Sequence, residues 1–233
     1  MKRACLSRKI IALALSLALL IPVFAVEIYA DYEDIRVGST VTFGSYEQDD
    51  ITLNGSEPID WYVLYIDDDD TALLVSKYVL FSGTYNDTWA STTWDRCTLR
   101  DWMNDVFYKS AFSSSERDAI EYTIISEEKN PTYKTSGGDE TEDKVFVLSI
   151  GEVNKYMKEK RLMKGVPTEY AIACGVRESK DGTCWYWLRN PGKDRTQAAY
   201  ITTKGTVSDA GVPLNYSDGG VRPAIRVNIR NLD

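Results

Sequence analysis

The sequence predicts an α+β fold in a single domain over residues 31–233. Segments typical of strands occur toward both ends of this region, and the predicted helices cluster in its middle. Strands and helices do not alternate along the chain, whereas a doubly wound α/β fold would require that alternation. The length suits one substantial hydrophobic core.

Residues 1–30 have the three parts of a secretory signal: a basic start, an apolar run over 10–26 and an exit rich in small residues. Cleavage is expected after Ala25 or Ala30, with Ala30 favoured. An uncleaved anchor stays open as the alternative, because the run approaches the roughly 20 residues that span a bilayer. We therefore expect a secreted or cell-surface protein. No second long apolar stretch occurs, so no membrane span is expected after cleavage.

Charge and composition exclude several function classes. The formal net charge is −8, and removal of residues 1–30 takes away four basic residues and one acidic residue, which leaves −11. Phosphate binding needs a basic surface, so nucleic acid is not an expected partner. The chain contains 0 histidines, which excludes histidine-dependent triads and histidine-ligated zinc sites. No metal and no cofactor are predicted.

The first predicted strand covers residues 39–46, where apolar and polar side chains alternate. Residues 59–66 and 71–77 are rich in branched and aromatic side chains and predict a hairpin around the aspartates at 67–70. Calcium loops space their ligands and place a glycine at the sharp turn. The four consecutive aspartates lack both features, so a solvated turn is expected instead.

The clearest predicted helix begins at Thr98. Its apolar stripe consists of Leu99, Trp102, Met103, Val106 and Phe107. Ser113 and Ser149 are each followed three residues later by a glutamate, which is the pattern of a capping box. Thr168 is expected to cap another short helix.

The remaining predicted strands are 122–126, 144–148, 185–189, 198–203 and 221–229. Residues 127–143 lack periodicity and contain Pro131, Gly137 and Gly138, so a long surface loop is expected there.

Several long phrases occur in an order that is similar to a known family. They include IDWYVLYIDDDDTALLVSKYVL, TWDRCTLRDWMNDVFYKSAFSSSE, DKVFVLS, PTEYA, WYWLRNPG and GGVRPAI, between residues 59 and 228. They resemble an uncharacterised bacterial domain of unknown function that is common in exported proteins of Gram-positive gut bacteria.

The phrases PTEYA, WYWLRNPG and GGVRPAI also resemble, more distantly, the formylglycine-generating enzyme and C-type lectin-like superfamily. This resemblance implies a C-type lectin-like fold, with irregular antiparallel sheets and flanking helices. Such a fold is shared by sugar binders, receptor tips and oxidases, so it does not assign a function.

Three cysteines follow the signal. Cys174 and Cys184 are ten positions apart, and export permits a disulfide between them that would contribute roughly 3 kcal/mol. Two free thiols are the open alternative. Cys97 precedes the helix that Thr98 begins and is expected to be a small buried residue beneath it.

A candidate ligand site is predicted in the strand and loop WYWLRNPGKDRTQ. Its members are Tyr186, Arg189, Asn190, Asp194 and Arg195. The polar members should share one exposed rim, with at least one of the three aromatic residues at 185–187 partly open. A core strand without a ligand is the alternative, since three consecutive aromatics place side chains on both faces. For Arg222, pairing with a carboxylate or with loop carbonyls is expected.

Two hypotheses follow for function. The first is a non-enzymatic extracellular binding module whose partner is a protein or a glycan. The second is an enzyme on a formylglycine-generating-like scaffold that uses cysteine or carboxylates. A copper oxidase of that kind would need Cys174 and Cys184 close together. The sequence does not indicate an oligomeric state.

Overall fold

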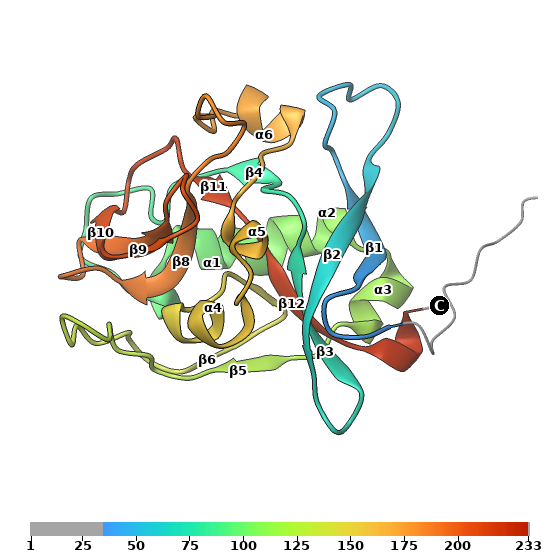
Figure 1. The fold of residues 1–233 in the computed structure, drawn as a ribbon, viewed down its shortest axis with the longest axis horizontal. Helices are drawn as coiled ribbons and strands as arrows, with labels where there is room; N and C mark the ends of the chain where they lie inside the picture. Colours follow the sequence, from blue (N-terminus) through green and yellow to red (C-terminus); the bar gives the residue numbers. More distant parts are fainter. Residues whose placement is uncertain (1–34, 233) are drawn as a thin grey trace, which may run out of the picture.

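The structure is a computed structural model that describes residues 35–232, so the predicted signal over residues 1–30 lies outside the described part (Figure 1). It has an α+β architecture, as predicted. One five-stranded sheet consists of β1 (Thr40–Tyr46), β2 (Glu57–Ile66), β3 (Thr71–Ser76), β12 (Ala224–Asn228) and β7 (Val145–Phe146), in that order. The other consists of β10 (Val207–Pro213), β9 (Gln197–Ile201), β8 (Tyr186–Pro191), β11 (Gly220–Val221) and β4 (Phe81–Ser82). No helix within residues 35–232 is long and apolar enough to span a membrane.

The first sheet is antiparallel throughout. The predicted hairpin is confirmed as β2 and β3, and the turn between them uses its own carboxylate. Asp67 Oδ1 accepts hydrogen bonds from the backbone N–H groups of Asp69 and Thr71, at 3.1 and 2.9 Å. The aspartate run therefore stabilises a tight connection.

The second sheet departs from the antiparallel prediction at one pair of strands, because β11 runs parallel to β8. The predicted strand 221–229 is divided between the two sheets at Arg222 and Pro223. Arg222 is buried, and its guanidinium donates to the carbonyl oxygens of Ser76 and Leu162. A structural role in pairing with carbonyls was expected, and it is found, although Ser76 ends β3 and Leu162 lies in α5 rather than in loops.

The short helices mostly begin where the sequence predicted. They are α1 (Thr98–Trp102), α2 (Tyr108–Ala111), α3 (Ser114–Ala119), α4 (Ile150–Tyr156), α5 (Lys160–Met163) and α6 (Glu169–Ala173). Ser113 and Ser149 form the predicted capping boxes, and Thr168 caps α6.

The apolar stripe of the first helix is only partly correct. A π-helical segment, Met103–Phe107, joins α1 to α2 and shifts the register of the side chains by one residue. Leu99, Met103 and Phe107 are buried, but Val106 is exposed. Trp102 is half-buried and stacks on Phe81, with ring centroids 4.6 Å apart.

The prediction of a continuous surface loop over residues 127–143 is wrong at its end. Residues Thr141–Asp143 form β6, which pairs with β5 (Thr123–Ile125) in a two-stranded ribbon. Figure 1 shows this ribbon continuing into a long loop that lies below the second sheet. Residues 127–139 of this loop form one side of the pocket described next.

Candidate functional site

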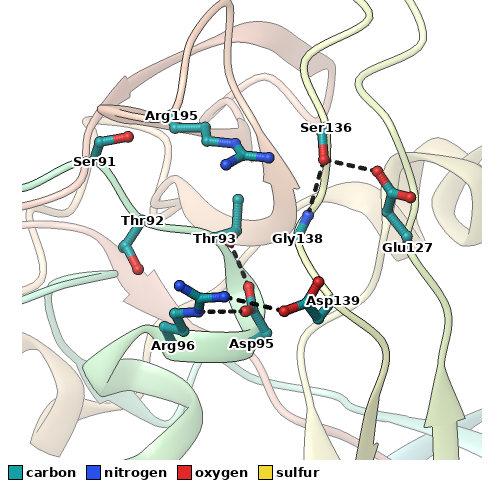
Figure 2. Close-up of a pocket in the computed structure, with 10 residues that line it drawn as sticks. All are labelled: Ser91, Thr92, Thr93, Asp95, Arg96, Glu127, Ser136, Gly138, Asp139 and Arg195. Atoms are coloured by element: carbon teal, nitrogen blue, oxygen red, sulfur yellow. Dashed lines mark hydrogen bonds and ion pairs between the residues drawn. The ribbon is translucent and has the colours of Figure 1, made fainter.

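A polar pocket of about 240 Å³ lies where three loop segments meet (Figure 2). It is lined by Ser91, Thr92, Thr93, Asp95, Arg96, Glu127, Ser136, Gly138, Asp139 and Arg195. We refer to these ten residues as the polar pocket. The segments are 91–96, the loop 127–139, and the connection between β8 and β9.

Residues 91–96 are fixed from beneath by Trp94. This side chain is buried, and its Nε1–H donates to Asp143 Oδ2 on β6 at 2.7 Å. Arg100 on α1 donates to the other oxygen of that carboxylate at 2.6 Å. The backbone N–H of Thr92 donates to the Arg195 carbonyl at 2.9 Å, which ties this segment to the β8–β9 connection.

The floor of the polar pocket contains a paired carboxylate. The Asp95 side chain is only 6% exposed, and it accepts hydrogen bonds from Thr93 Oγ1 and, at 2.9 Å, from Arg96 Nε. Arg96 also donates to Asp139 Oδ2 at 3.0 Å. Arg96 and Asp139 are both largely exposed, so their ion pair is expected to contribute little to stability.

Gly138 lets the loop 127–139 approach this floor closely. Its φ of +99° lies in the region that favours glycine, and a Cβ there would lie 2.1 Å from Asp95 Oδ1 and 2.5 Å from Thr93 Oγ1. No larger residue fits without moving the floor or the loop. Figure 2 shows Gly138 beside Thr93 in the middle of the polar pocket.

Several polar groups of the pocket are available to a ligand. Within the described residues, the Arg195 guanidinium has no hydrogen bond or ion pair, and neither do the hydroxyls of Ser91 and Thr92. Figure 2 shows the guanidinium extending over the pocket. Glu127 accepts a hydrogen bond from Ser136 through Oε1 only, at 2.7 Å.

Asn130 anchors the loop 127–139 to the second sheet. The residue is completely buried, and its Nδ2 donates to the carbonyls of Pro191 and Asp209, at 2.8 and 2.7 Å. Its Oδ1 accepts from the N–H groups of Thr132 and Tyr133, both at 3.0 Å. A single side chain therefore both shapes the loop and attaches it.

Arg189 is a second anchor of the same loop, although the sequence predicted it to contact ligand. It is 5% exposed, and its guanidinium pairs with Glu128 at 2.9 Å and with Glu152 on α4. It also donates to the Val147 carbonyl at 3.1 Å. Burial opposes the charge of Arg189, but the two carboxylates raise its pKa above the usual value.

Asn190 completes this connection. It is 2% exposed, its Oδ1 accepts from the N–H of Ile150 at 2.7 Å, and its Nδ2 donates to the Glu128 carbonyl at 3.2 Å. The prediction that Arg189 and Asn190 lie on an exposed rim is therefore wrong. Their polar groups are used to hold α4 and the loop 127–139 against β8.

Tyr186 is also buried rather than open to ligand. Its hydroxyl donates to the Met163 carbonyl at 2.9 Å and accepts from Arg222, and burial raises its pKa. Trp185 is the partly open aromatic residue of this strand, as expected for one of the three. It packs edge-on against Trp187 and Tyr200 and does not line the polar pocket.

Asp194 and Arg195 are exposed, as predicted, but only Arg195 lines the polar pocket. The Asp194 carboxylate accepts hydrogen bonds from the hydroxyl and the N–H of Thr196, and these bonds lower its pKa. Asp194 therefore shapes the turn. Of the five residues predicted for the ligand site, the structure places one in this pocket.

Residues 91–96 and Asp139 were not among the candidates predicted from the sequence. Hydroxyl and charged side chains in a loop have the same pattern as any solvated loop. The closely spaced glycines at 137 and 138 were a usable signal, since glycine is common where two backbones approach closely.

Cys174 and Cys184 are both free in the structure, which corresponds to the second of the two alternatives left open by the sequence. Cys174 is exposed at the C-terminal end of α6, whereas Cys184 is buried at the start of β8. Burial raises the pKa of the thiols of Cys184 and Cys97 to about 12. Cys97 is buried beneath α1, as expected.

One group of carboxylates among residues 35–232 has spacing compatible with a cation. Oxygens of Glu47, Asp49 and Glu57 lie within 4.8 Å of one another. Each already accepts a backbone N–H, from Ile51 or Gln48. The group shapes the β1–β2 connection, and nothing further marks it as a metal site.

Comparison with known proteins identifies a family. No curated protein and no solved structure gives a significant match to the chain. A family profile described as a domain of unknown function, DUF6273, matches residues 69–229, which is more than half of the chain. The matched region contains the whole polar pocket. The chain therefore belongs to the DUF6273 family, which agrees with the resemblance to a bacterial domain of unknown function.

Proposed function

We propose that this protein is an exported, non-enzymatic binding module whose extracellular glycan or protein ligand occupies the polar pocket. The observation that carries the proposal is the unpaired Arg195 guanidinium, which extends over the pocket beside the free hydroxyls of Ser91 and Thr92. A few placed polar groups in a concave site are how proteins orient small ligands.

Buried side chains hold the loop 127–139 in place, which favours a binding site over a merely solvated surface. Asn130, Arg189 and Asn190 are buried, and each holds the loop 127–139 through its side chain. A loop fixed in this way loses little conformational entropy when a ligand binds. The proposed site is thus organised before the ligand arrives.

One exposed aromatic residue lies just before the segment 91–96, and another lies in the loop 127–139. Trp89 is 73% exposed and is two residues before Ser91, and Tyr133 in the loop 127–139 is 45% exposed. Large aromatic side chains contribute much of the energy where proteins meet ligands. The pocket is smaller than the roughly 300 Å³ typical of sites for drug-sized ligands, so it suits one unit of a larger ligand.

Export and the finer fold belong to the same proposal. We propose that the signal over residues 1–30 directs secretion and that the scaffold is C-type lectin-like, as the distant resemblance of PTEYA, WYWLRNPG and GGVRPAI to that superfamily suggests. Intact-mass measurement of secreted protein should show loss of the first 25 or 30 residues. A mass that retains them would favour a membrane anchor.

A glycan and cell-wall binding screen of residues 31–233 tests the function, with copper-loaded protein alongside for the enzyme alternative. Arg195→Gln should weaken binding to any retained ligand by at least about tenfold, as expected for loss of a charge-assisted contact. Arg177→Gln makes the same charge change at an exposed position outside the pocket and serves as the control. Equal losses in both variants, or none in either, would contradict the proposed site.

A further inference from the structure

Two charged side chains of the polar pocket, Arg195 and Glu127, have no ion pair within residues 35–232, and their charges have opposite signs. We propose that the ligand unit bound there is a small zwitterion, with an anionic group on Arg195 and an ammonium group on the Glu127 carboxylate. This inference rests on the proposed function, because it takes the polar pocket as the ligand site.

The anionic end is recognised by Arg195. A guanidinium presents five N–H donors in a plane and matches both oxygens of a carboxylate. None of these donors has a partner in the described structure. The Ser91 and Thr92 hydroxyls line the same pocket and add two donors. The bond from Thr92 N–H to the Arg195 carbonyl fixes the backbone of Arg195 relative to them.

The cationic end is recognised by carboxylate oxygens. Glu127 uses Oε1 to accept from Ser136, and Asp139 uses Oδ2 to accept from Arg96. The second oxygen of each carboxylate, Glu127 Oε2 and Asp139 Oδ1, has no hydrogen bond among residues 35–232. An ionised carboxylate only accepts, and an ammonium supplies three donors. Figure 2 shows Arg195 on one side of Ser136 and Gly138 and Glu127 on the other.

A ligand of single charge fits this pocket less well. Arg96 pairs with the carboxylates of both Asp95 and Asp139, so the charges left without an ion pair are Arg195 on one side and the Glu127 carboxylate on the other. A purely anionic ligand would be repelled by the Glu127 carboxylate and by a chain of net charge −8. A purely cationic ligand would leave Arg195 without a partner. A zwitterion satisfies both ends, and the volume of about 240 Å³ suits an amino acid or a dipeptide.

The test uses the dipeptide alanyl-alanine, N-acetyl-alanyl-alanine, which lacks the ammonium, and alanyl-alanine amide, which lacks the carboxylate. Affinities are measured by NMR titration of residues 31–233, with methyl glucoside as the neutral probe. We expect the dipeptide to bind at least about tenfold more tightly than each analogue. Arg195→Gln should reduce dipeptide affinity to that of the amide and leave amide binding unchanged. Glu127→Gln should reduce dipeptide affinity to that of the N-acetyl form and leave binding of the N-acetyl form unchanged. The control Arg177→Gln should leave all of these affinities unchanged.

Equal affinity for the three peptides, methyl glucoside binding as tightly as the dipeptide, or no saturable peptide binding would each overturn the inference. The glycan and cell-wall screen distinguishes this failure from failure of the proposed function. If a contradicting peptide result is combined with loss of a screened ligand in Arg195→Gln, the polar pocket remains the site and only the zwitterion is rejected.

Discussion

Replacing Arg189 by methionine should lower the free energy of unfolding by about 3–5 kcal/mol, which is the usual cost of removing one partner from a buried ion pair. Arg189 is 5% exposed and compensates two carboxylates that approach it from different elements. Methionine keeps much of the aliphatic stem, so the loss reports charge and hydrogen bonds more than packing.

The two carboxylates contribute unequally to this cost. The Glu152 side chain is 16% exposed and would be left without a cation in a site that water barely reaches. The Glu128 side chain is 32% exposed, so solvent screens its charge more effectively. Most of the destabilisation should therefore come from Glu152 and from the unpaired Val147 carbonyl.

Urea denaturation of the unchanged protein and of Arg189→Met measures the difference in their free energies of unfolding. Arg195→Met is the matched control. Arg195 is exposed and unpaired, so the same replacement there should change stability by less than about 0.5 kcal/mol. Adding Glu128→Gln and Glu152→Gln to Arg189→Met should recover part of the loss, because the uncompensated charges disappear. An unchanged midpoint for Arg189→Met would refute the buried role.

Three further predictions concern the pocket floor and the thiols. Gly138→Ala should destabilise the protein by about 1–3 kcal/mol more than Gly55→Ala, as measured by urea denaturation. Both glycines have positive φ, but only Gly138 has close neighbours. Equal effects would mean that the pocket floor moves aside without cost. Iodoacetamide at pH 8 should label Cys174 alone in the folded protein, and an intact mass without an adduct would indicate a disulfide. Since burial raises the pKa of Cys97 and Cys184 from 9.0 to about 12, the unfolded chain loses these protons first, and stability should fall as the pH rises from 9 toward 12. A urea midpoint that stays constant over this range would contradict the shift.

Features governed by neighbouring residues could be predicted from the sequence. The capping boxes at Ser113 and Ser149 depend on a glutamate three residues later, and the β2–β3 hairpin depends on two apolar runs around one turn. The exposed position of Val106 could not be predicted in this way. It results from a π-helical segment, which the apolar spacing does not reveal.

The roles of Arg189 and Asn190 depend on partners far away in sequence. Arg189 meets Glu128, which is 61 positions earlier, and Asn190 meets Ile150, which is 40 positions earlier. Local sequence shows only that polar groups follow an aromatic strand, which fits a ligand rim and a buried scaffold equally. Arg195 was identified because it lies in the exposed turn beyond this strand.

The central claim, that ligand binds in the polar pocket, is tested most directly by hydrogen exchange of residues 31–233 with and without a ligand retained in the screen. Backbone amides in 91–96, 127–139 and 192–196 should exchange more slowly when the ligand is bound, because these three segments surround it. The β2–β3 hairpin should be unaffected. Protection confined to other segments, with these three unchanged, would contradict the claim.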